Sequence, residues 1–148
     1  MMQIARLTES TAYAHLDGLI ALLADAVNTG ASVGFLRPLN ADLARDYWHD
    51  VFACVGKGTR IVLIARNDNT IVGSVQLDLC VKQNGVHRAE VQKLMVGSQY
   101  RRQGIATALM GAVEAEALLA SRSLLVLDTE ARSAAEPFYE SRQWSRVG

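Results

Sequence analysis

The sequence predicts a single α/β domain in which helices flank a central β-sheet of mixed strand direction. Three Val- and Ile-rich segments follow one another with short polar turns between them, at 60–66, 70–81 and 86–96. This pattern is typical of an antiparallel meander. An amphipathic helix at 103–120 comes next, and the apolar run Leu-Leu-Val-Leu within 123–128 is typical of a buried parallel strand. Strands in both directions around intervening helices give an α/β fold with a mixed sheet.

The first part of the chain is predicted to form a short strand at 3–7 and a helix at 10–27. Thr8 stands where a side-chain oxygen can cap the first free N–H groups of that helix. Four large apolar residues recur at helical spacing and define its buried face: Leu16, Leu19, Ile20 and Leu23.

Residues 28–39 are predicted to form a loop, because Gly30 and Pro38 disfavour regular structure. The apolar residues of this loop either tuck under the domain or form a wall of a ligand pocket, and the sequence leaves both open. Asn40 can then cap a second helix at 41–54. Four apolar side chains recur along that helix: Leu43, Tyr47, Val51 and Phe52.

The meander and the segments after it complete the predicted sheet. The triplet Asn-Asp-Asn at 67–69 is a tight turn between the first two strands of the meander. A short helix at 134–142 and a last strand at 144–147 are expected after the apolar strand. The helix at 103–120 presents one apolar face, made of Ile105, Ala108, Leu109, Ala112 and Val113.

Composition and charge narrow the class of protein. The 148 residues are 50% hydrophobic with no formal net charge, which disfavours a nucleic-acid-binding surface. No apolar run reaches the ~20 residues of a membrane span, and the N-terminus lacks the apolar core of a signal peptide. Scattered histidines indicate no metal site, and Cys54 and Cys80 predict buried free thiols. We therefore expect a cytoplasmic protein with no membrane, nucleic-acid or metal partner.

The segment 92–119 organises the chain, because an extended stretch leads through a polar turn into R-R-Q-G and then a helix. Arg101, Arg102 and Gln103 stand where the first helical turn leaves N–H groups unpaired, and Gly104 lets a ligand approach the backbone. Free N–H groups, the helix dipole and two arginines predict an anion site suited to phosphate. For so short a motif, simple solvation of the arginines stays open as an alternative. Walker and dinucleotide loops are disfavoured, because neither G-K-[ST] nor G-x-G-x-x-G is present.

The same segment resembles the cofactor segment of the GNAT superfamily of N-acetyltransferases. Their pattern [RQ]-x-x-G-x-[GA] is matched by Arg101, Gly104 and Ala106, and the predicted order of elements is also that of the family. The resemblance implies that the loop holds the pyrophosphate of acetyl-coenzyme A. It further implies a strand that parts from its neighbour, so that main-chain N–H groups serve the pantetheine arm and the oxyanion. The residues so implied are Leu94, Met95, Val96, Arg101, Arg102, Gln103, Gly104, Ile105, Ala106 and Thr107.

Acetyl transfer to an amine needs a base for the amine proton, a donor for the thioester oxygen and an acid for the departing thiolate. An alkylamine has a pKa near 10.4, so its neutral form lies roughly 4–5 kcal/mol uphill at pH 7. Glu90, on the strand at 86–96, is a candidate base, and its alternative is a surface salt bridge with Arg88 or Lys93. Asp128 ends the apolar strand and is expected to face the crevice where α/β sheets bind ligands. A turn-forming role for Asp128 is equally open.

Tyr139 lies in the string A-E-P-F-Y-E of the last predicted helix. A lone tyrosine on a short helix usually packs in a core. The GNAT resemblance instead implies a tyrosine near the coenzyme sulfur that protonates the thiolate. Arg132 stands where many members carry an asparagine that contacts the coenzyme, so that contact is not carried over.

Three longer stretches resemble the tabtoxin-resistance acetyltransferases: G-A-S-V-G-F, L-C-x-K-x-N-G-x-x-R-A-E-V-Q-K-L-M-V and L-D-T-E-x-x-S-x-A-E-x-F-Y. They cover most of 30–139 and include Glu90, Asp128 and Tyr139. Members of that group acetylate the free amine of a β-lactam amino-acid toxin. The resemblance therefore implies a small amino-acid-like or dipeptide-like amine as acceptor, and a role in antibiotic resistance.

The sequence thus predicts an N-acetyltransferase in which the amine attacks acetyl-CoA directly. No cysteine or serine stands beside a paired base, so a covalent intermediate is not expected. Two alternatives are a non-catalytic acyl-CoA-binding module and an enzyme of the same fold that acts on a protein amine. Members of the family continue past W-S-R-V-G into a further strand, so the final strand is expected to be missing here. An open sheet edge at that end predicts a homodimer.

Overall fold

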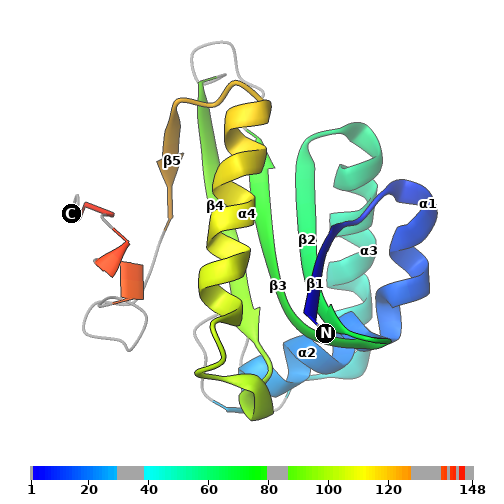
Figure 1. Cartoon of the computed structure of the whole chain (residues 1–148). Helices are drawn as coiled ribbons and strands as arrows, with labels where there is room; N and C mark the ends of the chain where they lie inside the picture. Colours follow the sequence, from blue (N-terminus) through cyan, green and yellow to red (C-terminus); the bar gives the residue numbers. More distant parts are fainter. Residues whose placement is uncertain are drawn as a thin grey trace.

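The computed structural model describes residues 2–29, 39–79, 87–127, 138–139, 141–142 and 144–145. They form a five-stranded sheet in the order β1-β2-β3-β4-β5, with helices on both faces (Figure 1). Strands β1 to β4 pair antiparallel, and β5 pairs with β4 in parallel. The predicted α/β class with a mixed, helix-flanked sheet is confirmed.

The elements follow the predicted order, with bounds that differ at several ends. They are β1 (Met2–Arg6), α1 (Glu9–Ala12), η1 (Tyr13–His15), α2 (Leu16–Asn28), α3 (Ala41–Lys57), β2 (Arg60–Asn67), β3 (Thr70–Leu79), β4 (Arg88–Val96), η3 (Ser98–Tyr100), α4 (Ile105–Leu119) and β5 (Leu124–Val126).

The predicted helix at 10–27 is divided into α1, the short 3₁₀ turn η1 and α2. Thr8 occupies the N-cap position of α1, and in its capping box the Thr8 N–H donates to the Thr11 hydroxyl at 3.0 Å. The break lies at His15, whose backbone angles of −106° and 4° leave the helical region. Apolar spacing continues across that residue, so the periodicity of the sequence does not reveal the break.

Helix α3 begins where the sequence predicts and ends later. The side chain of Asn40 accepts hydrogen bonds from the N–H groups of Asp42 and Leu43, at 2.7 and 3.4 Å. The helix runs past residue 54 and ends at Gly58, whose φ of 77° is the left-handed conformation of a glycine C-cap. Leu43 is 58% exposed, so it lies outside the core that the other apolar residues of this helix join.

Two apolar layers hold the helices against the sheet. On one face, α1, α2 and α3 pack against Val62 and Ile64 of β2. On the other face, α4 packs over β3 and β4 (Figure 1). The three large residues of the predicted α4 face are buried, since Ile105, Leu109 and Val113 are each no more than 3% exposed, whereas Ala108 and Ala112 are half-buried. Burying a side chain of this size contributes about 1.5–3 kcal/mol.

The C-terminal predictions fall mostly outside the described residues. Phe138 and Tyr139 are helical, and Trp144 and Ser145 lie in neither a helix nor a strand. Ser141 is also helical and Arg142 lies in a turn, so the predicted helix is present at three positions and the predicted strand is absent at Trp144 and Ser145. The other residues of 134–142 and 144–147 lie outside the described part of the chain. Cys54 is half-buried rather than buried, and Cys80 lies outside the described residues. No helix among the described residues is long and apolar enough to cross a bilayer.

Candidate active site

A β-bulge interrupts β4 in the middle of the sheet. Gln92 pairs with Gln76, and the next pair joins Met95 with Ser74, so Lys93 and Leu94 together face Val75. Lys93 has a φ of 54°, in the left-handed region that residues with a Cβ seldom adopt. Such outliers concentrate at functional sites, and this one directly precedes the predicted main-chain donors at 94–96.

Strands β4 and β5 stay paired for only a short distance. The parallel ladder joins Arg88 with Leu124, Ala89 with Leu125 and Glu90 with Val126. Beyond Glu90, the described residues provide no partner on the β5 side of β4. The edge of β4 from Val91 onward is therefore open within this part of the chain, as the predicted parting of the strands requires.

Helix α4 begins at Ile105, two residues later than the predicted start at Gln103. Gly104 is the N-cap, with a φ of 78° and no side-chain cap. The N–H groups that lack helical partners therefore belong to 105–107, and not to Arg101, Arg102 and Gln103 as the sequence indicated. A Cβ built on Gly104 meets no atom within 4 Å, so the space above this glycine is open.

The start of α4 lies close against β3 because one position of β3 is a glycine. A Cβ on Gly73 would stand 3.0 Å from the side chains of Ile105 and Leu109. Any larger residue would push the first turn of α4 away from the sheet. Gly73 thus fixes where the free N–H groups of that turn stand relative to β4.

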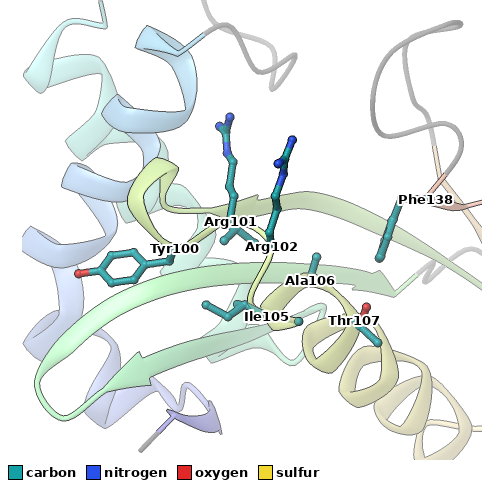
Figure 2. Close-up of a pocket in the computed structure, with 9 residues that line it drawn as sticks. Tyr100, Arg101, Arg102, Ile105, Ala106, Thr107 and Phe138 are labelled. Carbon is teal, nitrogen blue, oxygen red and sulfur yellow. The ribbon is translucent and has the colours of Figure 1, made fainter.

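A pocket of about 270 Å³ opens over the first turn of α4. In Figure 2 the side chains of Arg101 and Arg102 extend upward next to each other, Tyr100 points sideways to the left, and Phe138 comes from a separate segment. Among the described residues, neither arginine forms an ion pair with a carboxylate. The pocket is lined by Val96, Tyr100, Arg101, Arg102, Gly104, Ile105, Ala106, Thr107 and Phe138.

Most of the predicted cofactor residues therefore meet at one pocket. Gln103 is exposed and does not line it. Leu94 packs partly buried against the α4 layer, and the Met95 side chain is buried in the opposite layer. Only the main chain of these two residues is available for the predicted role.

The candidate base Glu90 is half-buried on the sheet face that packs against α2 and α3. Its carboxylate accepts a hydrogen bond from Gln92 Nε2 at 3.1 Å. The charge of Glu90 also acts on Lys93, whose pKa is lowered by burial and by Arg60 and is partly restored by Glu90. Lys93 Nζ lies 5.8 Å from the centre of the Tyr47 ring. Asp128, the other predicted carboxylate, lies outside the described residues.

Sequence reasoning missed a polar network beside Glu90. Arg60 Nη1 donates to Gln76 Oε1 at 2.7 Å, and Gln76 Nε2 donates to the Tyr47 hydroxyl at 2.9 Å. Arg60 also lies 3.7 Å from Asp78, which is the cross-strand partner of Glu90. A signal was present, because polar residues at 74, 76 and 78 alternate with apolar ones along β3.

Tyr139 belongs to an aromatic cluster against the α4 layer. Its ring makes edge contacts with Phe138 and Trp144, with centroids 5.3 and 6.2 Å apart. Burial raises the pKa of the Tyr139 phenol, so the hydroxyl stays protonated at neutral pH. Phe138, and not Tyr139, lines the pocket.

Comparison with known proteins decides the family. A family model described as "Acetyltransferase (GNAT) family" matches residues 22–143. The chain belongs to the GNAT family. A relative from Azospirillum brasilense, named an uncharacterized N-acetyltransferase in the hisH-hisA intergenic region, is 32% identical over 127 residues, or 84% of this chain and 74% of the relative. This GNAT chain is therefore an acetyltransferase by family.

Solved structures share the GNAT fold at low identity. An N-acetyltransferase from Staphylococcus aureus Mu50 is 16% identical, with a TM-score of 0.74 over 97% of this chain and 82% of that one. The PaiA N-acetyltransferase of Thermoplasma acidophilum, solved with coenzyme A, is 14% identical, with a TM-score of 0.77 over 100% and 91%. An aminoglycoside acetyltransferase from a soil metagenome, solved with sisomicin, is 18% identical, with a TM-score of 0.72 over 99% and 92%.

Among the described residues, no group of three or more His, Cys, Asp or Glu side chains could hold a metal ion. The polar groups that surround the pocket are arginines, main-chain N–H groups and a threonine hydroxyl. Guanidinium groups and main-chain N–H groups bind anions.

Proposed function

We propose that this GNAT enzyme uses acetyl-CoA to acetylate the primary amine of a small amino-acid-like or antibiotic-like acceptor. The amine attacks the thioester directly while both substrates are bound. One observation carries the proposal: the pocket over α4 lies on one face of the sheet, whereas Glu90 stands on the other face, at the last β4–β5 pair before the strands part. A cofactor and an acceptor can thus approach the same opening from opposite sides.

The pocket over α4 is suited to the pyrophosphate of the coenzyme. The N–H groups of 105–107 lie at the positive end of the helix dipole. Arg101 and Arg102 add two charges that bind phosphate through several N–H donors. Gly104 leaves the approach open. The coenzyme A found with the Thermoplasma neighbour supports the same ligand for this chain.

The open edge of β4 is suited to the pantetheine arm. Main-chain groups of a strand without a neighbour can pair with the amides of that arm, as another strand would. We assign this role to the main chain of Leu94, Met95 and Val96. One of their N–H groups then stabilises the thioester oxygen as negative charge develops.

Two carboxylates are suited to the acceptor amine. Glu90 takes the proton, directly or through water, and Asp78 adds negative charge from the facing strand. Together they favour the approach of an ammonium group, which must then lose a proton before it attacks. We also keep for Asp128 the role that the sequence predicts, as a further acidic group that serves the acceptor amine.

We assign to Tyr139 the role of the acid that protonates the departing thiolate. Its raised pKa keeps the phenol protonated, so that it can donate to the sulfur. The ring contacts with Phe138 and Trp144 orient the phenol, and Phe138 extends the cluster to the pocket wall.

The proposed class of acceptor is supported by a sequence resemblance and by a structural neighbour. The likeness to tabtoxin-resistance acetyltransferases favours an amino-acid-like amine, and the aminoglycoside acetyltransferase neighbour favours an antibiotic amine. We also propose that the enzyme acts in the cytoplasm as a homodimer.

A screen of amine acceptors for acetyl-dependent thiol release tests the proposal. The panel contains amino acids, dipeptides, an aminoglycoside, a polyamine and peptides with a free N-terminus or a lysine. We expect turnover with small amino-acid-like or antibiotic amines. Coenzyme A binding without turnover on any amine would favour a non-catalytic acyl-CoA-binding module, and turnover on peptides alone would favour a protein acceptor.

A further inference from the structure

The last turn of α2 holds the loop 97–104, here called the anion loop, which leads into the pocket over α4. The carboxylate of Asp25 accepts two hydrogen bonds from Ser98, one from the main-chain N–H and one from the hydroxyl, each at 2.7 Å. Ser98 is the first residue of η3, so Asp25 caps that turn from outside. Hydrogen bonds to a charged acceptor are among the stronger ones in proteins.

The same turn of α2 also contacts the other end of the loop. Arg101 donates to the Thr29 hydroxyl at 3.2 Å. That hydroxyl in turn donates to the carbonyl oxygen of Asp25 at 2.7 Å. The Arg101 guanidinium keeps further N–H donors for a phosphate, because it has five in all.

Packing against the sheet holds in place the part of helix α2 that makes these contacts. Leu22, Leu23, Ala26 and Val27 surround Asp25 in sequence, and all four are buried in the layer between α2 and the sheet. The backbone that carries Asp25 is therefore fixed by packing, and the carboxylate has little freedom to follow a displaced loop.

The loop is equally fixed on its sheet side. The N–H of Gly97 donates to the Val72 carbonyl at 2.8 Å, and the N–H of Tyr100 donates to the Gly97 carbonyl at 2.8 Å. A Cβ on Gly97 would stand 2.9 Å from the Tyr100 ring. Because Gly97 and Tyr100 are packed so tightly, a shift of Ser98 also displaces Arg101 and Arg102.

We propose that Asp25 is a positioning residue for the anion loop: through Ser98 it sets where Arg101 and Arg102 stand, and thereby the affinity for the coenzyme phosphates. This inference rests on the proposed function, in which the pocket over α4 binds the pyrophosphate. Asp25 touches no ligand in this arrangement, and it acts only through the loop.

Charge alone predicts the opposite effect of removing Asp25. A carboxylate near an anion site repels the phosphates, so its loss would tighten coenzyme binding if electrostatics were its only contribution. Positioning predicts that binding weakens. The direction of the change therefore separates the two mechanisms.

Three variants and a control test the inference by calorimetry with coenzyme A and by steady-state kinetics. Asp25→Ala removes both hydrogen bonds, whereas Asp25→Asn removes the charge and can keep both, because the Ser98 hydroxyl can accept from the new amide. Ser98→Ala removes the side-chain hydrogen bond alone. Asp17→Ala, at an exposed position in the first turn of the same helix, is the control.

We expect Asp25→Ala to raise the Kd of coenzyme A and the KM of acetyl-CoA about tenfold or more, as for loss of a charged hydrogen bond. The kcat at saturating acetyl-CoA should stay within about twofold of the parent enzyme, since KM with kcat unchanged reports uniform binding. Asp25→Asn should bind nearly as well as the parent, Ser98→Ala should lie between, and Asp17→Ala should be unchanged.

Two outcomes would overturn the inference. Tighter or unchanged binding by Asp25→Ala would show that the carboxylate does not position the loop. Equal losses of affinity in Asp25→Ala and Asp25→Asn would assign the effect to general destabilisation, because Asp25→Asn can keep both hydrogen bonds to Ser98. If Asp25→Ala fails to fold, Asp25→Asn and Ser98→Ala still decide, because parent-like binding by Ser98→Ala would also reject the inference.

The double variant Arg101→Ala with Arg102→Ala distinguishes a failure of this inference from a failure of the proposed function. If it binds coenzyme A as the parent does, the assignment of the pocket is wrong. If it loses binding while Asp25→Ala keeps it, only the positioning role of Asp25 is wrong.

Discussion

Glu90 on β4 and Asp78 on β3 are direct cross-strand partners, so their carboxylates share the sheet face that packs against α2 and α3. Like charges directly opposite each other destabilise a sheet unless other groups offset them. Here Arg60 lies 3.7 Å from Asp78, and Gln92 donates to Glu90. We propose that this pair of acids, next to the opening between β4 and β5, serves the acceptor amine.

Substitution at Gly104 is expected to abolish coenzyme binding and to lower stability moderately. In Gly104→Glu, the new side chain enters open space and places a negative charge against the pyrophosphate. The φ of 78° adds backbone strain of roughly 1–2 kcal/mol for a residue with a Cβ. Calorimetry with coenzyme A measures the loss of affinity, and thermal unfolding measures the strain.

The matched control for that variant is Gly111→Glu, on the exposed side of the same helix, where a Cβ also meets nothing within 4 Å. It should bind coenzyme A as the parent does. Undiminished affinity of Gly104→Glu for coenzyme A would show that the coenzyme does not bind in this pocket.

Glu90→Gln is expected to lower kcat far more than it raises the KM of acetyl-CoA, because Glu90 serves the acceptor amine. Loss of a general base typically costs 10²–10⁴-fold. Raising the pH should partly restore the rate, since more of the amine is then already neutral. The measurement is a pH–rate profile of variant and parent, with exposed Glu9→Gln as the control. Identical profiles would reject the role of Glu90 as base.

Asp78→Asn is expected to weaken acceptor binding while kcat changes little. The Asp78 carboxylate contributes charge to the acceptor side, and its removal leaves Glu90 in place. The KM of the amine should therefore rise about fivefold, the size of a surface charge interaction near 1 kcal/mol. The KM of acetyl-CoA should not change. A larger change in the KM of acetyl-CoA than in the KM of the amine would show that Asp78 does not belong to the acceptor site.

Tyr139→Phe is expected to reduce kcat about tenfold to a thousandfold. The phenyl ring keeps the contacts with Phe138 and Trp144, so thermal stability should stay close to that of the parent. Unchanged turnover would assign Tyr139 to packing alone.

The stability that Tyr139 contributes to the fold is expected to fall at high pH. Burial raises the phenol pKa above its ordinary value of 10.0, so the folded state holds this proton more tightly than the unfolded chain does. The neutral phenol therefore contributes stability below pH 10, and that contribution falls as the pH rises through the folded pKa. The parent should lose more stability than Tyr139→Phe above pH 10, which unfolding in denaturant at two pH values can measure.

Self-association is expected at the edge of the sheet that β5 forms. Three large apolar side chains are exposed near that edge, Leu118 at 76%, Leu119 at 81% and Leu124 at 42%. A contact between two copies would cover them. Sedimentation at micromolar concentration should show a dimer, and Leu118→Lys with Leu119→Lys should shift it toward monomer. A monomeric parent that still acetylates small amines would contradict the prediction.

The sequence by itself determined the order of elements and the place of the anion loop. Apolar spacing is a local property, so the face of α4 that carries Ile105, Leu109 and Val113 could be predicted from 3.6-residue periodicity. The cap at Asn40 and the clustering of Arg101, Gly104 and Ala106 at a helix start follow from short stretches of chain in the same way.

Tertiary structure decided what depends on contacts between distant segments. The break at His15, the bulge at Lys93 and the end of the β4–β5 ladder at Glu90 arise from strand register and helix packing, which no local pattern encodes. The pairing of Asp78 with Glu90, and of Asp25 with Ser98, joins residues on different elements. Such pairs form only after the sheet and α2 have taken their places, because each depends on packing that neither residue's neighbours in sequence provide.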